Sequence, residues 1–339
     1  MSHHPTPLKF LMPGWFAIVM GLSGLALAWQ RATPFMGDTA GAGALVLGAL
    51  AAGIFVLLAG LSLLRWQRYP QALAEDLKHP VRHAFAAAVP VSLILLATVA
   101  VAAGGASPLA DGLWWAGAAL QLVVTVWALG RWLSPVKGLG LVWPSITPVL
   151  FIPVVGNVLV PLAGVPLGHD SWSAAQLGIG VLLWPVLLTL LAVRIATTGL
   201  WPQRLLPTTF ITIAPPAVIG LALLQLGAPL LLGWALWGMA LFFLLWSGLV
   251  FKRSVSQPFG VAFWGLSFPL AALAALTLRL AVEAVPAFQT LATLVLALAT
   301  LVIAALVLAT VKGLRDGSLL APEPIATLTP VGSTDPARP

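Results

Sequence analysis

Hydrophobic stretches separated by one or a few charged residues repeat along the whole chain. Seven uncharged stretches are each about the length of one membrane span: 10–30, 39–64, 84–110, 112–130, 171–193, 254–278 and 284–311. A helix needs about 20 apolar residues to cross the hydrocarbon core of a bilayer. Two longer stretches, 138–168 and 205–251, predict one and two further spans, the second pair divided by a turn at Gly227-Ala-Pro229. The pattern therefore predicts ten spanning helices.

Prolines recur in alternate predicted spans. One proline marks the first helix of each successive pair: Pro13, Pro90, Pro153, Pro216 and Pro269. A proline removes a backbone hydrogen bond, and membranes tolerate this where the freed groups are buried in protein or line an aqueous cavity. The ten spans thus group into five helical hairpins, in which the odd helices surround a central path and the even helices enclose them. Ordinary kinking in a helix bundle is the alternative explanation.

The amino-acid composition is that of a membrane protein. Hydrophobic residues make up 60% of its 339 residues and charged residues only 7%, which is typical of an all-α integral membrane protein. Residues 1–315 are expected to form a single transmembrane domain, with the first span retained rather than cleaved as a signal. The tail 316–339 is rich in Pro, Thr and Ser and is expected to be disordered.

The basic residues predict the orientation of the hairpins. With the N-terminus in the cytoplasm, only Arg31 and Arg279 fall on the outer side. Thirteen basic residues then lie on the inner side near the membrane: Lys9, Arg65, Arg68, Lys78, Arg82, Arg131, Lys137, Arg194, Arg204, Lys252, Arg253, Lys312 and Arg315. Cytoplasmic loops carry an excess of Lys and Arg. We therefore expect both termini in the cytoplasm, and the net positive charge requires no nucleic-acid partner.

The predicted spans lack the groups that most chemistry would need. Their interiors contain no Asp, Glu, Lys or His, whereas proton-coupled transporters usually place titratable groups at that depth. The chain has no phosphate-binding loop, no cysteine and no histidine cluster with ligand spacing. We therefore expect no enzyme activity, no cofactor and no bound metal, and a neutral path favours passive conduction over coupled pumping.

Two features would let a neutral path favour anions. Each proline can begin a half-helix whose first amides carry partial positive charge. A basic cytoplasmic mouth would raise the local concentration of anions, although topology alone also explains its residues, which are Lys78, Arg82, Lys137, Arg204, Lys252 and Arg253.

Small polar residues on the odd helices are candidates for the wall of the path. They are Ser92, Thr147, Asn157, Thr212, Ser267 and Thr277. Asn157 is the most costly of these to leave unpaired in lipid, so it should face protein or the path. Bonding between helices is an equal alternative for the whole set.

Five stretches resemble the tellurite-resistance/dicarboxylate transporter family, which includes bacterial TehA proteins and the slow anion channels of plant guard cells. They are Met12-Pro-Gly-Trp-Phe-Ala-Ile-Val-Met-Gly21, Asp76-Leu-Lys-His-Pro-Val-Arg82, Phe151-Ile-Pro-Val-Val-Gly-Asn-Val-Leu-Val-Pro-Leu-Ala-Gly164, Ile213-Ala-Pro-Pro216 and Phe263-Trp-Gly-Leu-Ser-Phe-Pro269. The resemblance implies ten helices in fivefold pseudo-symmetric hairpins, odd helices lining a pore, and a homotrimer with one pore per protomer. It also implies a pore gate at Phe268, which matches the phenylalanine that blocks the pore on the ninth helix.

These observations favour an anion channel of the bacterial inner membrane, passing small monovalent inorganic anions such as chloride or nitrate. The alternative is a secondary carrier or exporter of tellurite, sulfite or a C4-dicarboxylate, because other members of the family that the chain resembles are described as such transporters. A structural membrane scaffold is disfavoured because prolines occur in alternate spans.

Overall fold

The chain is a helical membrane protein. The computed structural model describes residues 7–134, 136 and 140–321, and every regular element within them is a helix. Eight helices in these residues are long and apolar enough to cross a membrane, so the chain is a multi-pass membrane protein. Lys137 and the part 322–339 of the predicted tail lie outside the described residues.

Five long helices, here called the outer helices, expose most of their surface. In the most apolar part of each, only 17% to 33% of the residues are buried inside the protein. Such exposure suits contact with lipid, because the hydrocarbon solvates apolar side chains. The outer helices are α3 (Asp38–Arg68), α6 (Pro108–Trp132), α9 (Asp170–Thr198), α11 (Leu230–Gly248) and α14 (Pro286–Arg315).

Five segments alternate with the outer helices along the chain and are here called the inner segments. Each begins with a 3-10 turn or longer 3-10 stretch and continues as an α-helix. They are η2 with α1 (Pro13–Phe16, Ala17–Arg31), η3 with α5 (Arg82–Ala87, Ala88–Gly104), the broken segment η5, α7, η6 and α8 (Pro148–Leu150, Phe151–Val155, Gly156–Leu159, Pro161–Gly164), η7 with α10 (Gln203–Ile213, Ala214–Gln225), and η8 with α13 (Val261–Leu266, Ser267–Ala281).

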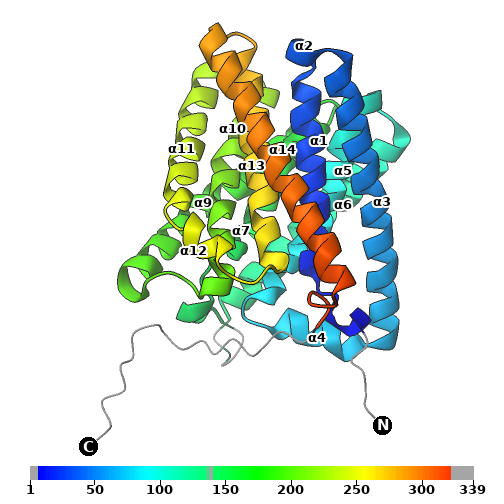
Figure 1. The fold of residues 1–339 in the computed structure, drawn as a ribbon, viewed down its shortest axis with the longest axis vertical. Coiled ribbons are helices and arrows are strands. Elements are labelled where there is room, and N and C mark those ends of the chain that lie inside the picture. The colour runs from blue at the N-terminus through cyan, green and yellow to red at the C-terminus, as the bar shows by residue number, and fades with distance from the viewer. Residues whose placement is uncertain (1–6, 135, 137–139, 322–339) are drawn as a thin grey trace, which may run out of the picture.

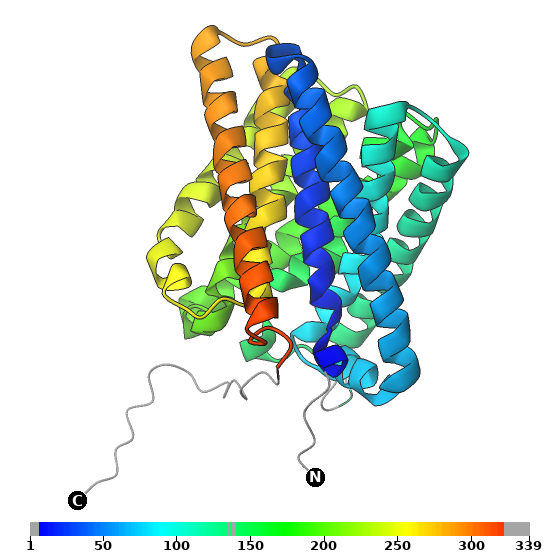
Figure 2. The same ribbon diagram turned by 45° about the vertical axis from the view of Figure 1, so that its right-hand side comes forward.

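The inner segments are buried and contact one another in a closed ring. In the three that form continuous long spans, which contain α5, α10 and α13, 67%, 94% and 78% of the residues in the most apolar part are buried. Helix α1 packs against α5 and α13, α10 packs against α13 and η6, and η6 packs against α5. Each outer helix packs on the inner segment that precedes it, as α3 does on α1 and α14 on α13 (Figures 1 and 2).

Short elements connect the long ones at the two ends of the bundle. They are η1 (Pro7–Phe10), α2 (Thr33–Met36), α4 (Pro70–Lys78), η4 (Trp143–Ser145) and α12 (Phe251–Val255). In Figure 1, α4 and the last turn of α14 lie at the same end of the bundle, and α2 lies at the opposite end.

Two of the ten predicted spans are shorter than the sequence suggests. Helix α1 has 15 residues, and the apolar segment Pro148–Gly164 is broken into α and 3-10 pieces. Prolines at 148, 153 and 161 explain the breaks, since each removes a backbone donor. Eight long spans are therefore observed in the described residues, and the number ten stays a prediction.

Candidate functional site

All five inner segments surround one cavity in the middle of the bundle. Its empty volume is about 680 Å³, counting the part open to solvent. Each inner segment contributes side chains to its wall, for example Met20 from α1, Phe85 from η3, Ile152 from α7, Val218 from α10 and Phe268 from α13. The ring of inner segments therefore encloses a space at the place where the alternating prolines predicted a path.

The wall of the cavity is almost entirely apolar. None of the described residues that line it carries a charge, and Thr208 is the one that carries a hydroxyl group. That hydroxyl donates to the Leu205 carbonyl oxygen at 2.6 Å. In the described part of the chain, no three His, Asp or Glu side chains gather as a metal site would require. The cavity can therefore attract an ion only through backbone dipoles and more distant charges.

Phe268 lies half-buried on the cavity wall, directly before Pro269. Its ring packs against α1 at Gly24, where a methyl group would lie 3.0 Å from Cδ2 of Phe268. The absence of a side chain at Gly24 thus provides the space that the ring occupies. The aromatic ring predicted as a pore gate is placed on the cavity wall.

The five marker prolines lie near the change from 3-10 to α winding. Four of them, Pro90, Pro153, Pro216 and Pro269, are the third residue of α5, α7, α10 and α13. In the first turn of a helix the missing N–H would have no partner within the helix, so proline is tolerated there. Pro13 differs, because it is the first residue of η2 and precedes α1 by one turn.

Five of the six predicted polar wall residues bond to protein and none of the six lines the cavity, while the hydroxyl of Thr147 is buried without a hydrogen-bond partner among the described residues. Ser92, Thr212 and Ser267 are buried, and each hydroxyl donates to a backbone carbonyl of its own segment. Asn157 is fully buried and bonds through both ends of its amide. None of the four is among the residues lining the cavity. Asn157 thus bonds between helices, whereas the three hydroxyls bond within their own segments.

The predicted basic mouth has two kinds of member. Lys78, Arg204 and Lys252 are exposed. Arg82 is different, because its Nη1 lies 3.0 Å from Oδ1 of Asp76. Its charge is thus partly compensated within the protein, because Asp76 also pairs with Arg65.

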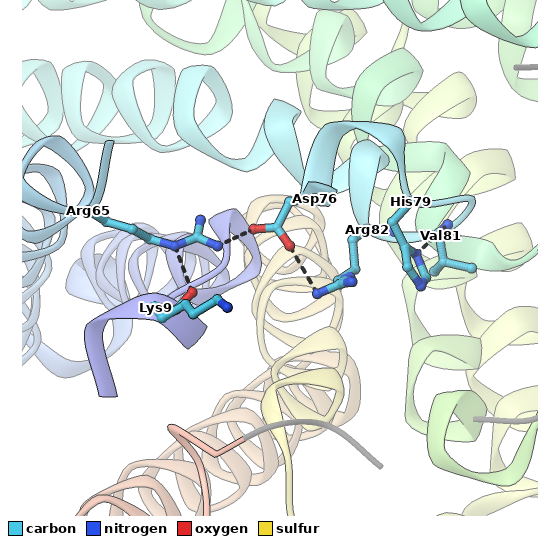
Figure 3. A network of polar contacts seen from close by, with 6 residues as sticks. All are labelled: Lys9, Arg65, Asp76, His79, Val81 and Arg82. Carbon is cyan, nitrogen blue, oxygen red and sulfur yellow. Dashed lines mark hydrogen bonds and ion pairs between the residues drawn. The ribbon is translucent and has the colours of Figure 1, made fainter. Parts of the chain in front are cut away.

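Asp76 holds together a buried charged cluster that joins four elements (Figure 3). Its Oδ2 accepts from Nη2 of Arg65 at 2.7 Å, and both of these side chains are about 95% buried or more. The Nε of Arg65 also donates to the carbonyl oxygen of Lys9 at 3.0 Å. The cluster thereby connects η1, the end of α3, α4 and the start of η3 at one end of the bundle.

His79 shapes the turn that places Arg82 beside Asp76. Its Nδ1 accepts from the backbone N–H groups of Val81 and Arg82, both at 3.1 Å. Burial, together with the positive charge of Arg82, lowers the pKa of His79 to about 4. The ring is therefore neutral at neutral pH, which leaves Nδ1 free to accept these bonds.

Several buried polar residues of the outer helices were not assigned a role from the sequence. Gln121 and Thr125 on α6 and Gln176 on α9 are at most 1% exposed and bond to the broken inner segment. A signal was present, because an amide in an apolar span is costly unless it finds a partner. Which partner it finds depends on helix packing, which the sequence pattern does not specify.

Comparisons with known proteins agree on one family. Residues 11–311 match the family described as SLAC1, voltage-dependent anion channel. The S-type anion channel SLAH2 of Arabidopsis thaliana is 28% identical over 211 residues, which are 62% of this chain and 40% of the plant protein. The tellurite resistance protein TehA homolog of Haemophilus influenzae is 26% identical over 289 residues, covering 80% of each chain. The sulfite efflux pump SSU1 of Arthroderma benhamiae is 23% identical over 315 residues, covering 80% of this chain and 82% of that protein.

Proposed function

Because the chain belongs to the SLAC1 family of voltage-dependent anion channels, we propose that it conducts small monovalent anions, such as chloride and nitrate, across the bacterial inner membrane. The observation that carries this proposal is the cavity surrounded by all five inner segments, with no charged side chain among its described lining residues. A fixed charge in the path would bind an ion tightly and slow its release. A neutral path suits rapid conduction down a gradient.

Backbone dipoles and the exposed basic residues supply the preference for anions. The α-helices of the inner segments begin beside the prolines, and their first amides carry partial positive charge. Lys78, Arg204 and Lys252 are exposed and add full positive charges at the cytoplasmic mouth. The anion is thus attracted at the entrance and solvated weakly inside.

Phe268 is the gate in this proposal. Its ring lies on the wall of a cavity that offers almost no polar group. A narrow apolar constriction excludes water and blocks ions without any charge. Movement of the ring away from α1 would open the path.

The alternative function is a coupled carrier or an exporter of tellurite, sulfite or a C4-dicarboxylate. Two relatives are named for tellurite resistance and sulfite efflux. A C4-dicarboxylate is doubly charged at neutral pH and would need compensating positive charge along its path, and the described cavity wall offers none. This difference in charge favours monovalent anions over a dicarboxylate.

Uncoupled conduction is directly testable. In liposomes containing the purified protein, the reversal potential should follow the chloride or nitrate gradient and stay unchanged when a proton gradient is imposed. The physical reason is that no titratable side chain lines the described cavity. A reversal potential that moves with pH by a fixed stoichiometry would instead establish the carrier.

We also propose ten spans in fivefold pseudo-symmetric hairpins, both termini in the cytoplasm, and assembly as a homotrimer with one pore in each protomer. The closed ring of contacts between inner segments supports the hairpin arrangement. The trimer follows from the family resemblance. Chemical cross-linking in native membranes should therefore yield a species of three chains.

The orientation can be tested because the chain has no natural cysteine. Val285 is 67% exposed and precedes α14, so Val285→Cys should react with an impermeant maleimide added from the periplasmic side. Arg253→Cys, exposed on α12, should react only after the membrane is permeabilised. The reverse labelling pattern would overturn the assignment of the hairpins.

A further inference from the structure

A network of buried amides and hydroxyls lies behind the broken inner segment, on the side away from the cavity. It begins at Trp172, whose Nε1 donates to Oε1 of Gln176 at 2.9 Å. Gln176 in turn donates to Oδ1 of Asn157 at 3.0 Å and to the Ala118 carbonyl oxygen at 2.8 Å. The network therefore links α9, α6 and the broken segment through side chains that are shielded from the cavity.

The network ends on two backbone carbonyl groups of α7. The Pro153 oxygen accepts from Nε2 of Gln121 at 2.8 Å and lies 2.6 Å from Oγ1 of Thr125. Asn157 donates through Nδ2 to the Val154 carbonyl oxygen and to Oγ1 of Thr125, both at 2.8 Å. Side chains of the outer helix α6 thus bind the Pro153 oxygen, and Asn157 of the inner segment binds the Val154 oxygen, where the winding changes from α to 3-10.

Residues of the broken segment lie on two faces, with Gly156 next to both the cavity and the Gln121 amide. Phe151, Ile152, Val155, Gly156 and Leu159 line the cavity. The bonded groups belong to Pro153, Val154 and Asn157, none of which lines it. The carbonyl oxygen of Pro153 is consequently directed toward α6 and held there.

Gly156 permits this arrangement. A methyl group at this position would lie 2.5 to 2.8 Å from three atoms of the Gln121 side-chain amide. Any larger residue would therefore displace Gln121 from the Pro153 oxygen. The glycine allows the amide of an outer helix to reach the backbone of an inner segment.

A carbonyl oxygen carries partial negative charge, so a carbonyl turned into the path would repel an anion and attract a cation, as rings of carbonyls do in cation-selective filters. We propose that Gln121 and Thr125 are positioning residues for anion selectivity, which hold the Pro153 carbonyl away from the permeating ion. This inference rests on the proposed function. In this inference α6 contributes to anion selectivity although it does not line the cavity.

The experiment measures reversal potentials of the full-length protein in planar bilayers under a potassium chloride gradient, with Phe268→Ala as the background if wild-type current is small. Thr125→Val keeps the shape of the side chain and removes the hydroxyl, and Gln121→Leu removes the amide donor. Each should lower the chloride-to-potassium permeability ratio about fivefold, the factor that corresponds to one net hydrogen bond.

Two further variants separate ion selection from packing. Thr125→Ser retains the hydroxyl and should retain the permeability ratio. Thr98→Val is the matched control, because Thr98 is buried on α5 and its hydroxyl bonds only to the Ile94 carbonyl of its own helix. This control should leave the ratio unchanged.

The outcomes distinguish the proposed role of Gln121 and Thr125 from the proposed channel function. Absence of chloride current in both wild type and Phe268→Ala would refute the proposed channel. Anion current whose permeability ratio is the same in wild type, Thr125→Val and Gln121→Leu would leave the channel intact and overturn this inference. A loss of thermal stability without a change in ratio would likewise overturn it and assign the network to packing.

Discussion

Replacing Phe268 with alanine should raise the basal chloride current at least about tenfold, which requires a barrier lowered by only about 1.4 kcal/mol. The ring lies on the wall of an apolar cavity and packs against Gly24. Its removal would widen the path and allow water to enter, so that ions would no longer cross a dry constriction. The measurement is current in planar bilayers from equal amounts of purified protein.

Phe263→Ala is the matched control for this experiment. Phe263 lies five residues earlier on the same inner segment, packs against Phe259 with ring centres 5.4 Å apart, and does not line the cavity. Its substitution should leave the current near the wild-type value. Phe268→Leu should raise the current less than Phe268→Ala, because more of the apolar plug remains. Equal currents in wild type and a stable Phe268→Ala protein would exclude Phe268 from the gate.

Asp76→Asn should lower the free energy of unfolding by about 3–5 kcal/mol, the usual cost of removing one partner from a buried ion pair. The carboxylate binds Arg65 at 2.7 Å and Arg82 at 3.0 Å, and its side chain is only 3% exposed. An asparagine of the same shape would leave two guanidinium groups without a counter-charge. The change is measured as a fall in the thermal unfolding midpoint of the purified protein.

The neighbouring carboxylate provides the comparison. Glu75 is exposed on α4, so Glu75→Gln should change the stability by no more than about 0.5 kcal/mol. A second substitution, Arg65→Gln in the Asp76→Asn protein, removes one of the uncompensated charges and should recover part of the loss. If Asp76→Asn unfolds at the wild-type temperature, the cluster does not stabilise this end of the bundle.

The alternation of buried and exposed helices could be predicted from the sequence because prolines and charged residues interrupt the hydrophobic stretches at definite positions. Pro90, Pro216 and Pro269 mark buried inner segments, and the intervening helices expose most of their surface. Both signals act within a few residues of the chain. The alternation can therefore be predicted without knowing which helices pack against each other.

The polar contacts could not be predicted in the same way. Asn157 was equally suited to the cavity wall and to a bond between helices, and its partners Thr125 and Gln176 lie 32 and 19 residues away in the chain. Arg82 was predicted as part of the basic mouth, and its ion pair with Asp76 across the turn at His79 was not foreseen. Such pairings depend on the relative rotation of packed helices, which hydropathy does not encode.

The 3-10 winding at the start of the inner segments changes how far they reach. A 3-10 helix rises about 2.0 Å per residue and an α-helix about 1.5 Å. Pro13–Phe16 followed by the 15 residues of α1 thus extends about 30 Å. On the same basis the broken segment Pro148–Gly164 extends about 29 Å. The 3-10 turns add about 2 to 4 Å over continuous α winding, and the summed length of these two short segments approaches the hydrocarbon core, which is about 30 Å thick.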